Sequence, residues 1–201
     1  MFYGCLGTSI MLVVILVAAY LGFRYAVERF TDTRPLPLPT TRFTVEQIQR
    51  LHARVVNFSS AVDDNRSAGP LMLTTDEANA LIQTDPNWAF LKDQIYVTFR
   101  SNLLDAQLSI PAEQLGSSRL RGRYLNANGT FTVALHDGQL QVNVQSISAK
   151  GRPVPENIMR HIRTRNFALS FTNAEANVAL GKLQDVRIED GKLIIVPKPA
   201  K

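Results

Sequence analysis

The chain of 201 residues is 45% hydrophobic and 19% charged, and its formal net charge is +5. This length is enough for one membrane segment and one folded domain with a hydrophobic core. The positive charge is modest and no basic arm or RNA-binding aromatic motif is present, so we do not expect a nucleic-acid partner. The single cysteine, Cys5, excludes a disulfide scaffold and a thiolate metal site.

The first 23 residues contain no charged side chain, and Arg24 ends this apolar stretch. A bilayer core of about 30 Å requires about 20 helical residues, so Met1–Phe23 is long enough to span it. A cleaved signal peptide is the alternative, with small residues at positions 17–19, but the basic region that begins such peptides is missing. The sequence therefore favours an uncleaved transmembrane anchor over residues 1–24.

The charges that flank this anchor predict the opposite membrane orientation from the one that an anchored β-rich domain usually has. Lys and Arg residues tend to remain on the cytoplasmic side, and Arg24, Arg29 and Arg34 follow the apolar stretch, partly offset by Glu28 and Asp32. This bias alone would place the domain in the cytoplasm. An N-terminal anchor followed by a linker and a β-rich domain more often points outward. We expect a single-pass protein with an extracytoplasmic domain, on the periplasmic or cell-surface side.

Residues 25–43 are expected to be a juxtamembrane segment and linker. Pro35, Pro37 and Pro39 alternate within it, and proline at this density favours extended polyproline II structure, which acts as a semi-rigid spacer. At about 3.1 Å per residue, Thr31–Arg42 would lift the domain about 30 Å from the bilayer.

Residues 44–201 are expected to form one α+β domain that begins with a long helix. Thr44 and Gln47 match a capping box, and the apolar residues behind them follow a 3,4,3,4 spacing that draws one stripe along a helix. The stripe comprises Ile48, Leu51, Val55, Phe58 and Val62. It can bind a partner, lie on a membrane or pack on the domain's own sheet, and the last use is favoured.

A second capping box, formed by Thr74 and Glu77, opens another helix. A short helical turn after Pro86 is expected to place Trp88 over the core. From Ile95 the apolar period changes to two, which indicates β-strands. The alternating runs cover residues 95–99, 104–110, 131–135 and 140–144.

Two Asp-Gly pairs, at 137–138 and 190–191, each separate two apolar runs. Such a pair predicts a two-residue hairpin of type I′, because both central residues of this turn need positive φ. After Val144 the apolar residues change parity at Ile147, which predicts a β-bulge. Two more helices are expected, over 155–165 and 173–183. This order predicts a curved antiparallel sheet packed against helices.

Three segments of the chain resemble a known group of proteins. Leu73–Ile82 is similar to the L-T-x-x-E-x-N-x-L helix start of small bacterial envelope proteins related to the TULIP lipid-binding superfamily, and the segments 135–140 and 151–155 accompany it. The resemblance covers about residues 71–197. It implies a long helix against a strongly curved sheet with an apolar groove between them, outside the cytoplasm, and it transfers no catalytic motif.

Two candidate sites follow from these patterns. The first is a groove for lipid or another apolar ligand, lined by Ile48, Leu51, Val55, Phe58, Phe99, Val133 and Val142. The second is a set of arginines whose forked side chains suit lipid phosphates, although a solvated, salt-bridged surface is the favoured alternative. Its members are Arg119, Arg121 and Arg123, which alternate as on one face of a strand, and Arg160 and Arg163 on a helix.

No catalytic or metal-binding signature is present: the three histidines lack metal-ligand spacing, and the G-x-S-x-G and P-loop motifs are missing. We therefore expect a non-enzymatic protein without a cofactor. Its partner is membrane lipid or another apolar ligand, or alternatively it is a structural or assembly partner in a membrane protein complex with no ligand of its own. An open apolar cavity favours the first hypothesis, and a filled core with an exposed apolar patch favours the second.

Overall fold

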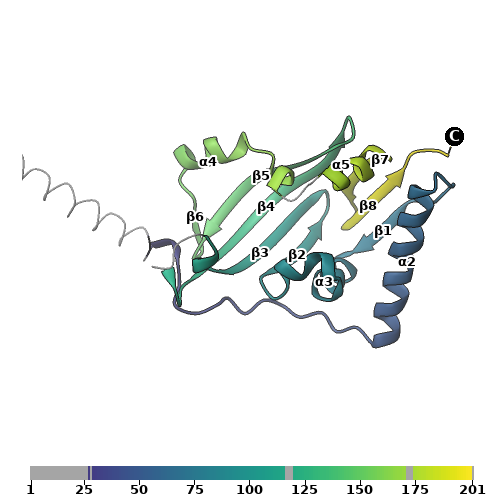
Figure 1. Ribbon diagram of the computed structural model, residues 1–201. Coiled ribbons are helices and arrows are strands. Elements are labelled where there is room, and N and C mark those ends of the chain that lie inside the picture. The colour runs from purple at the N-terminus through teal and green to yellow at the C-terminus, as the bar shows by residue number, and fades with distance from the viewer. Residues whose placement is uncertain (1–26, 28, 116–119, 171–173, 201) are drawn as a thin grey trace, which may run out of the picture.

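The computed structural model describes residues 27, 29–115, 120–170 and 174–200 (Figure 1). The expected anchor, Met1–Phe23, lies outside these residues. Among the helices of the described part, none has both the length and the apolar character that a membrane crossing requires.

Two antiparallel sheets form the domain. The larger contains, in spatial order, β2 (Ile95–Arg100), β3 (Leu103–Pro111), β4 (Tyr124–His136), β5 (Gln139–Ala149) and β6 (Arg152–Pro153). The smaller contains β1 (Leu71–Thr74), β8 (Lys192–Pro197) and β7 (Leu183–Glu189), in that order. The expected α+β class with antiparallel strands packed against helices is therefore confirmed.

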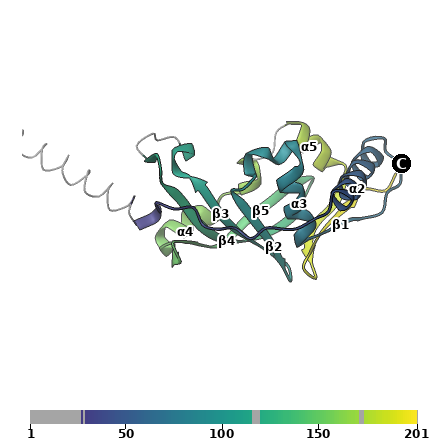
Figure 2. The same ribbon diagram turned by 90° about the horizontal axis from the view of Figure 1, so that it is seen from below.

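The described helices lie around these sheets. They are α2 (Val45–Asp63), α3 (Thr75–Thr84), α4 (Glu156–Arg163) and α5 (Ala174–Gly181), with 3-10 turns η1 (Pro86–Leu91), η2 (Ala112–Leu115) and η4 (Phe167–Ser170). Figures 1 and 2 show α2 and the C-terminus at one end of the molecule, and α4 at the other end beside the first described residues. Figure 2 shows α3 and α5 on the same side of the strands.

The local signals of the sequence form the structures they predict. Thr44 and Gln47 exchange capping-box hydrogen bonds at the start of α2, and Thr74 and Glu77 do the same at the start of α3. Each box satisfies two backbone N–H groups that a helix start leaves unpaired. Trp88 is an exception, because 44% of its surface is exposed and it does not cover the core as expected.

Both Asp-Gly pairs turn with positive φ at both residues, at 51° and 74° for Asp137 and Gly138 and at 51° and 70° for Asp190 and Gly191. The predicted bulge is also present in β5. Thr130 pairs with Ser146 and Phe131 with Val144, so Gln145 is the additional residue. This extra residue restores the apolar side chain of Ile147 to the core face.

The two faces of the five-stranded sheet differ sharply in polarity. The core face packs against helices, and its buried cluster comprises Ala78, Val97, Phe99, Ala106, Phe131, Val144, Met159 and Ile188. The opposite face is polar, as the register across four strands shows for Thr98, Asp105, Thr130 and Ser146. Such alternation is expected for an antiparallel sheet with one buried and one solvated face.

Candidate functional site

The segment that follows the expected anchor is bound to the five-stranded sheet. Asp32 forms an antiparallel bridge with Tyr124, in which each backbone N–H donates to the other residue's carbonyl, at 2.8 and 2.7 Å. Thr31, immediately before it, is 6% exposed, and its N–H donates to the carbonyl of Val27 at 2.9 Å. The chain therefore joins the sheet before the first proline of the linker, Pro35.

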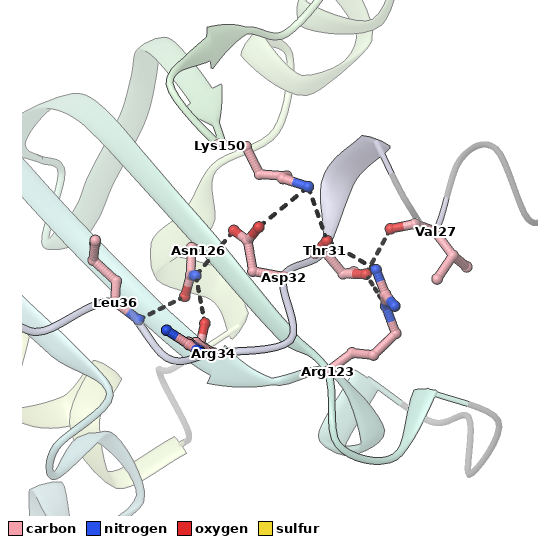
Figure 3. Close-up of polar contacts among 8 residues, drawn as sticks. All are labelled: Val27, Thr31, Asp32, Arg34, Leu36, Arg123, Asn126 and Lys150. Atoms are coloured by element: carbon pink, nitrogen blue, oxygen red, sulfur yellow. Dashed lines mark hydrogen bonds and ion pairs between the residues drawn. The ribbon is translucent and has the colours of Figure 1, made fainter.

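Two basic side chains converge on this bridge (Figure 3). The Nε of Arg123 donates to Oγ1 of Thr31 at 2.6 Å, and its Nη2 donates to the Thr31 carbonyl at 3.1 Å. Lys150 donates to the same carbonyl at 3.3 Å and lies 3.1 Å from a carboxylate oxygen of Asp32. Thr31 and Asp32 therefore contact both the start of β4 and the turn between β5 and β6.

Asn126 on β4 completes the attachment (Figure 3). Its Nδ2 donates to the Asp32 carboxylate and to the Arg34 carbonyl, both at 3.0 Å. Its Oδ1 accepts from the Leu36 N–H at 3.1 Å and from the Ser109 hydroxyl at 3.0 Å. We call these contacts, made by Ser109, Arg123, Asn126 and Lys150 to residues 31–36, the juxtamembrane clamp.

The clamp corrects the expectation that Thr31–Arg42 is a free polyproline spacer. Proline lacks an N–H group, but the N–H groups of Asp32 and Leu36 remain and both are bonded to the sheet. The polar face of the sheet supplies the partners, since Ser109 and Asn126 lie there. The segment therefore runs against the domain over residues 31–36 and does not hold it at a distance there.

The residues of the L-T-x-x-E-x-N-x-L segment all have structural contacts. Thr74 and Glu77 form the capping box, and Leu73 and Leu81 are buried beside α2. Asn79 is 2% exposed, and its amide hydrogen-bonds the N–H and the carbonyl of Val97 at the outer edge of β2. This segment therefore builds the junction between α3 and the two sheets.

A similar contact covers the part of β5 that the short strand β6 leaves unpaired. The Oδ1 of Asn166 accepts from the Val142 N–H at 2.9 Å, and its Nδ2 donates to the Leu140 carbonyl at 2.8 Å. Side chains thus occupy backbone groups on β2 and β5 that another strand would otherwise bind. Sequence reasoning included Asn79 in the L-T-x-x-E-x-N-x-L segment without assigning it a contact, and it missed Asn126 and Asn166. The sequence around an asparagine does not reveal its distant partner.

The contacts at the start of α3 change the pKa of the Glu77 carboxylate. Burial alone would raise its pKa, but the backbone N–H of Thr74, hydrogen bonding by Arg54 and the charge of Arg54 together lower the pKa below its usual value. Arg54 lies 2.8 Å from Glu77. The same guanidinium donates to the carbonyl of Met72 at 3.3 Å, so it ties α2 to β1 and α3.

The residues expected to line one ligand groove lie in two clusters. Leu51, Val55 and Phe58 of α2 pack with β1, α3 and β8, in a cluster centred on Leu71, Leu73, Ala80 and Leu81. Phe99, Val133 and Val142 belong to the core of the five-stranded sheet. Ile48 is partly buried on α2. The helix stripe and the three strand residues are therefore not brought together, and Leu193 packs against both clusters.

A recess of about 490 Å³ opens between the C-terminal half of α2 and β1. Its lining includes Phe58 of the expected groove, together with Arg54, Asn57, Ala68, Gly69, Pro70, Leu71 and Met72. Met72 is 49% exposed at its rim. We call this feature the α2–β1 recess; it is the place where the apolar cluster beside α2 reaches the surface.

A second hollow, of about 550 Å³, lies where the β2–β3 and β7–β8 turns meet. The N–H of Gly191 donates to the Ser101 carbonyl at 3.2 Å and joins the two turns. Phe99 and Ile188 line its apolar part, and the remaining lining is polar or charged. Phe99 is therefore the strand residue of the expected groove that reaches a surface hollow.

The arginines expected to bind anionic groups have different surroundings. Arg119 lies outside the described residues. Arg121 is in a turn before β4, 3.7 Å from Glu113, and Arg123 belongs to the juxtamembrane clamp. The expectation that Arg121 and Arg123 share one face of a strand is wrong, because β4 begins only at Tyr124.

The two arginines expected on a helix lie on α4. Arg160 is exposed there, and Arg163 donates to the carbonyl of the bulge residue Gln145 and pairs with Glu156. The contact with Gln145 satisfies a carbonyl that the bulge leaves out of the strand ladder. Arg163 therefore helps to fix α4 against β5, and Arg160 is the freer of the two side chains.

Within the described part of the chain, no group of three or more His, Cys, Asp and Glu side chains is arranged to hold a metal ion. Comparison with models of protein families, with curated proteins and with solved structures gave no match.

Proposed function

We propose that this chain is a membrane-anchored, non-enzymatic protein with an extracytoplasmic domain, and that it acts as a structural or assembly partner in a membrane protein complex. The juxtamembrane clamp is the observation that carries this proposal. It begins at Thr31, eight residues after the apolar stretch ends at Phe23. A domain tied down so close to its anchor has a restricted orientation at the membrane, which favours binding to another membrane-bound protein.

The packing of the apolar residues also supports a partner in preference to an enclosed ligand. The residues expected to face a ligand mostly face one another in two filled clusters. The α2–β1 recess reaches the surface, and Phe58, Leu71 and Met72 belong to its lining. An open recess of this kind suits an apolar side chain of a partner protein.

Binding of a lipid or another apolar ligand is the second candidate function. The volume of the α2–β1 recess, about 490 Å³, falls within the range of about 300–1,000 Å³ typical of small-molecule sites. The resemblance of Leu73–Ile82 to envelope proteins of the TULIP type favours the same function. In this case an acyl chain would contact Phe58 and Leu71.

One photocrosslinking experiment separates the two candidates. A benzophenone amino acid is introduced at Asn57, which lines the recess, in the full chain in its native membrane. A discrete protein adduct that disappears with Met72→Asp supports the assembly role, whereas an adduct with the mass of a lipid supports the ligand role. The same probe at Gln49, on α2 outside the recess, is the matched control. Identical adducts from both positions, or none from Asn57, would exclude both candidates at this site.

The membrane arrangement is tested separately. The full chain should remain in membranes through carbonate extraction and should keep its N-terminal residues. Protease added to the extracytoplasmic side should digest the domain. Release by carbonate would contradict the anchor, and protection from protease would place the domain in the cytoplasm, as the arginines after the apolar stretch suggest.

A further inference from the structure

The positive charge of the chain is concentrated near the juxtamembrane clamp. Residues 120–124 and 150–165 together contain seven Lys and Arg residues and one acidic residue, Glu156, whereas the whole chain has a net charge of +5. The acids that contact this region from other elements are Asp32, at Lys150, and Glu113, at Arg121. The region therefore still carries an excess of positive charge after these acidic neighbours are counted.

Part of this charge is used within the fold and part faces solvent. Arg123 and Lys150 hold the clamp, and Arg163 pairs with Glu156. Arg152, Arg160 and Arg165 are exposed, and in the described part of the chain no carboxylate pairs with them.

An exposed apolar residue lies in the chain between two of these arginines. Ile158 on α4 is 44% exposed, and it lies in the chain between Arg152 and Arg160. A surface that combines arginines with an exposed aliphatic residue can meet both the phosphates and the upper acyl region of a bilayer. We call Arg152, Ile158 and Arg160 the basic end.

The length of the chain keeps this end close to the membrane. The four residues from Phe23 to Val27 can span at most about 14 Å even when fully extended. The Thr31 N–H donates to the Val27 carbonyl, and two residues joined by a bond of this i,i+4 kind lie about 6 Å apart. Thr31 therefore lies within about 20 Å of the end of the apolar stretch.

Because the clamp bonds Thr31 to the domain, the basic end of the domain also lies near the membrane. Lys150 donates to the carbonyl of Thr31, and α4 begins six residues after Lys150. Figures 1 and 2 both place α4 at the same end of the domain as the first described residues, with α2 at the opposite end.

We propose that the basic end rests on the anionic phospholipid surface of the leaflet that its own anchor enters. This inference rests on the proposed membrane anchorage and adds a second, electrostatic contact to it. Negative surface potential attracts basic residues near the membrane and decays within a Debye length. The clamp, within about 20 Å of the end of the apolar stretch, brings the basic end within reach of this surface. Arginine's fork suits the lipid phosphates, and an exposed aliphatic side chain such as Ile158 can enter the interface. The contact turns α2 and its recess away from the bilayer, toward a partner.

The test uses the full chain, reconstituted in phosphatidylcholine vesicles with and without phosphatidylglycerol. Cys5→Ser removes the native thiol, and Asn157→Cys on α4 carries an environment-sensitive fluorophore. Quenching of this probe by spin-labelled lipid should rise at least about twofold when phosphatidylglycerol is present at 0.15 M salt, where the Debye length is about 8 Å, and should fall back at 1 M salt, where it is about 3 Å. The same probe at Ala53 on α2 should not respond.

Two charge-matched variants identify the surface that makes the contact. Arg152→Glu and Arg160→Glu together should abolish the response at Asn157. Arg42→Glu and Arg50→Glu, at and around α2, change the net charge equally and should leave the response intact. Equal loss in both variants would show a general charge effect and would overturn the proposal.

Other outcomes are equally decisive. If quenching of the probe in the otherwise wild-type chain does not change with phosphatidylglycerol or with salt, the proposal is wrong, even if the first variant folds poorly. Complete competition by millimolar inorganic phosphate would assign the arginines to a soluble anion instead of a bilayer. In both cases carbonate resistance would show that the anchor itself remains valid, and loss of that resistance would instead remove the proposed function.

Discussion

The side-chain amide of Asn79 on α3 makes both outward-facing backbone hydrogen bonds of Val97 on β2. Its Nδ2 donates to the Val97 carbonyl at 2.7 Å, and its Oδ1 accepts from the Val97 N–H at 2.9 Å. The Thr75 hydroxyl accepts from the next outward-facing N–H, that of Phe99, at 2.9 Å. Because these groups are occupied, β2 does not offer a free edge to another strand. A partner of this protein is therefore expected to bind through side-chain surfaces and not by extending the five-stranded sheet from β2.

The first prediction concerns this edge. Asn79→Ala leaves the buried N–H and carbonyl of Val97 unpaired, and we expect a loss of about 2–3 kcal/mol in the free energy of unfolding. Asn166→Ala affects the less buried edge of β5, where water can replace the amide, and should cost about 1 kcal/mol. Denaturant unfolding of the full chain in detergent micelles measures both losses. A larger loss for Asn166→Ala would contradict this explanation.

The second prediction concerns the clamp. Asn126→Ala removes one of the two side-chain oxygens that accept from the Leu36 N–H, the other being the Ser109 hydroxyl. It also removes the amide that donates to the Asp32 carboxylate and to the Arg34 carbonyl. Hydrogen exchange at Leu36 should accelerate by about tenfold, which corresponds to the net strength of about one hydrogen bond. Asn128→Ala, at an exposed position on the same strand and the same face, is the control. Unchanged exchange in Asn126→Ala would mean that the linker does not depend on this residue.

The third prediction concerns the β4–β5 turn. Gly138 has φ of +74°, and an added Cβ would lie 3.4 Å from the Cα of Gly181. Gly138→Val therefore introduces a strained backbone next to a close neighbour, and we expect a loss of about 1–3 kcal/mol. Gly69→Val, where an added Cβ meets nothing within 4 Å, should change stability by less than about 0.5 kcal/mol. Thermal unfolding of both variants measures these changes in stability. Equal melting temperatures would contradict the strained turn.

The fourth prediction concerns pH. The folded state lowers the pKa of Glu77, so its contribution to stability is complete above the unfolded-state value of about 4.3 and is lost as pH falls through the lower folded-state pKa. Glu77→Gln can keep the capping geometry but not the charge. The stability difference from wild type should be about 0.5–1 kcal/mol at pH 7, as for other partly exposed ion pairs, and should vanish in acid.

Arg54→Gln provides the control for this pH dependence, because Arg54 supplies the opposite charge. In that background the effect of Glu77→Gln at pH 7 should shrink. A stability difference between the wild type and the Glu77→Gln variant that persists unchanged into strong acid would show that the charge of Glu77 does not contribute.

The structures that the sequence predicted correctly are those whose signals lie within a few residues. The capping boxes at Thr44 and Thr74 connect residues three positions apart. The Asp137-Gly138 turn needs only positive φ at adjacent residues, and the bulge at Gln145 follows from the change of apolar parity along one strand. Backbone geometry and side-chain period act locally, so a single sequence is enough to read them.

The candidate site depended on contacts that no local pattern carries. Asn126 lies 90 residues from Leu36, and Arg123 lies 92 residues from Thr31. Periodicity indicated that α2 and the strands have apolar faces, but it did not indicate which faces meet. The structure packs Phe58 against the small sheet and Val142 within the large one, which divides the expected groove.

By itself, then, the sequence determined the helices, the turns and the alternating faces of the strands, together with the apolar stretch and the surplus of arginines. Only the tertiary structure decided that residues 31–36 are clamped, that asparagines close the sheet edges and that α4 lies at the same end of the domain as the first described residues. The physical reason is that one amide or guanidinium can bond many partners. Which partner it reaches is set by how the whole chain packs, and not by the residues beside it.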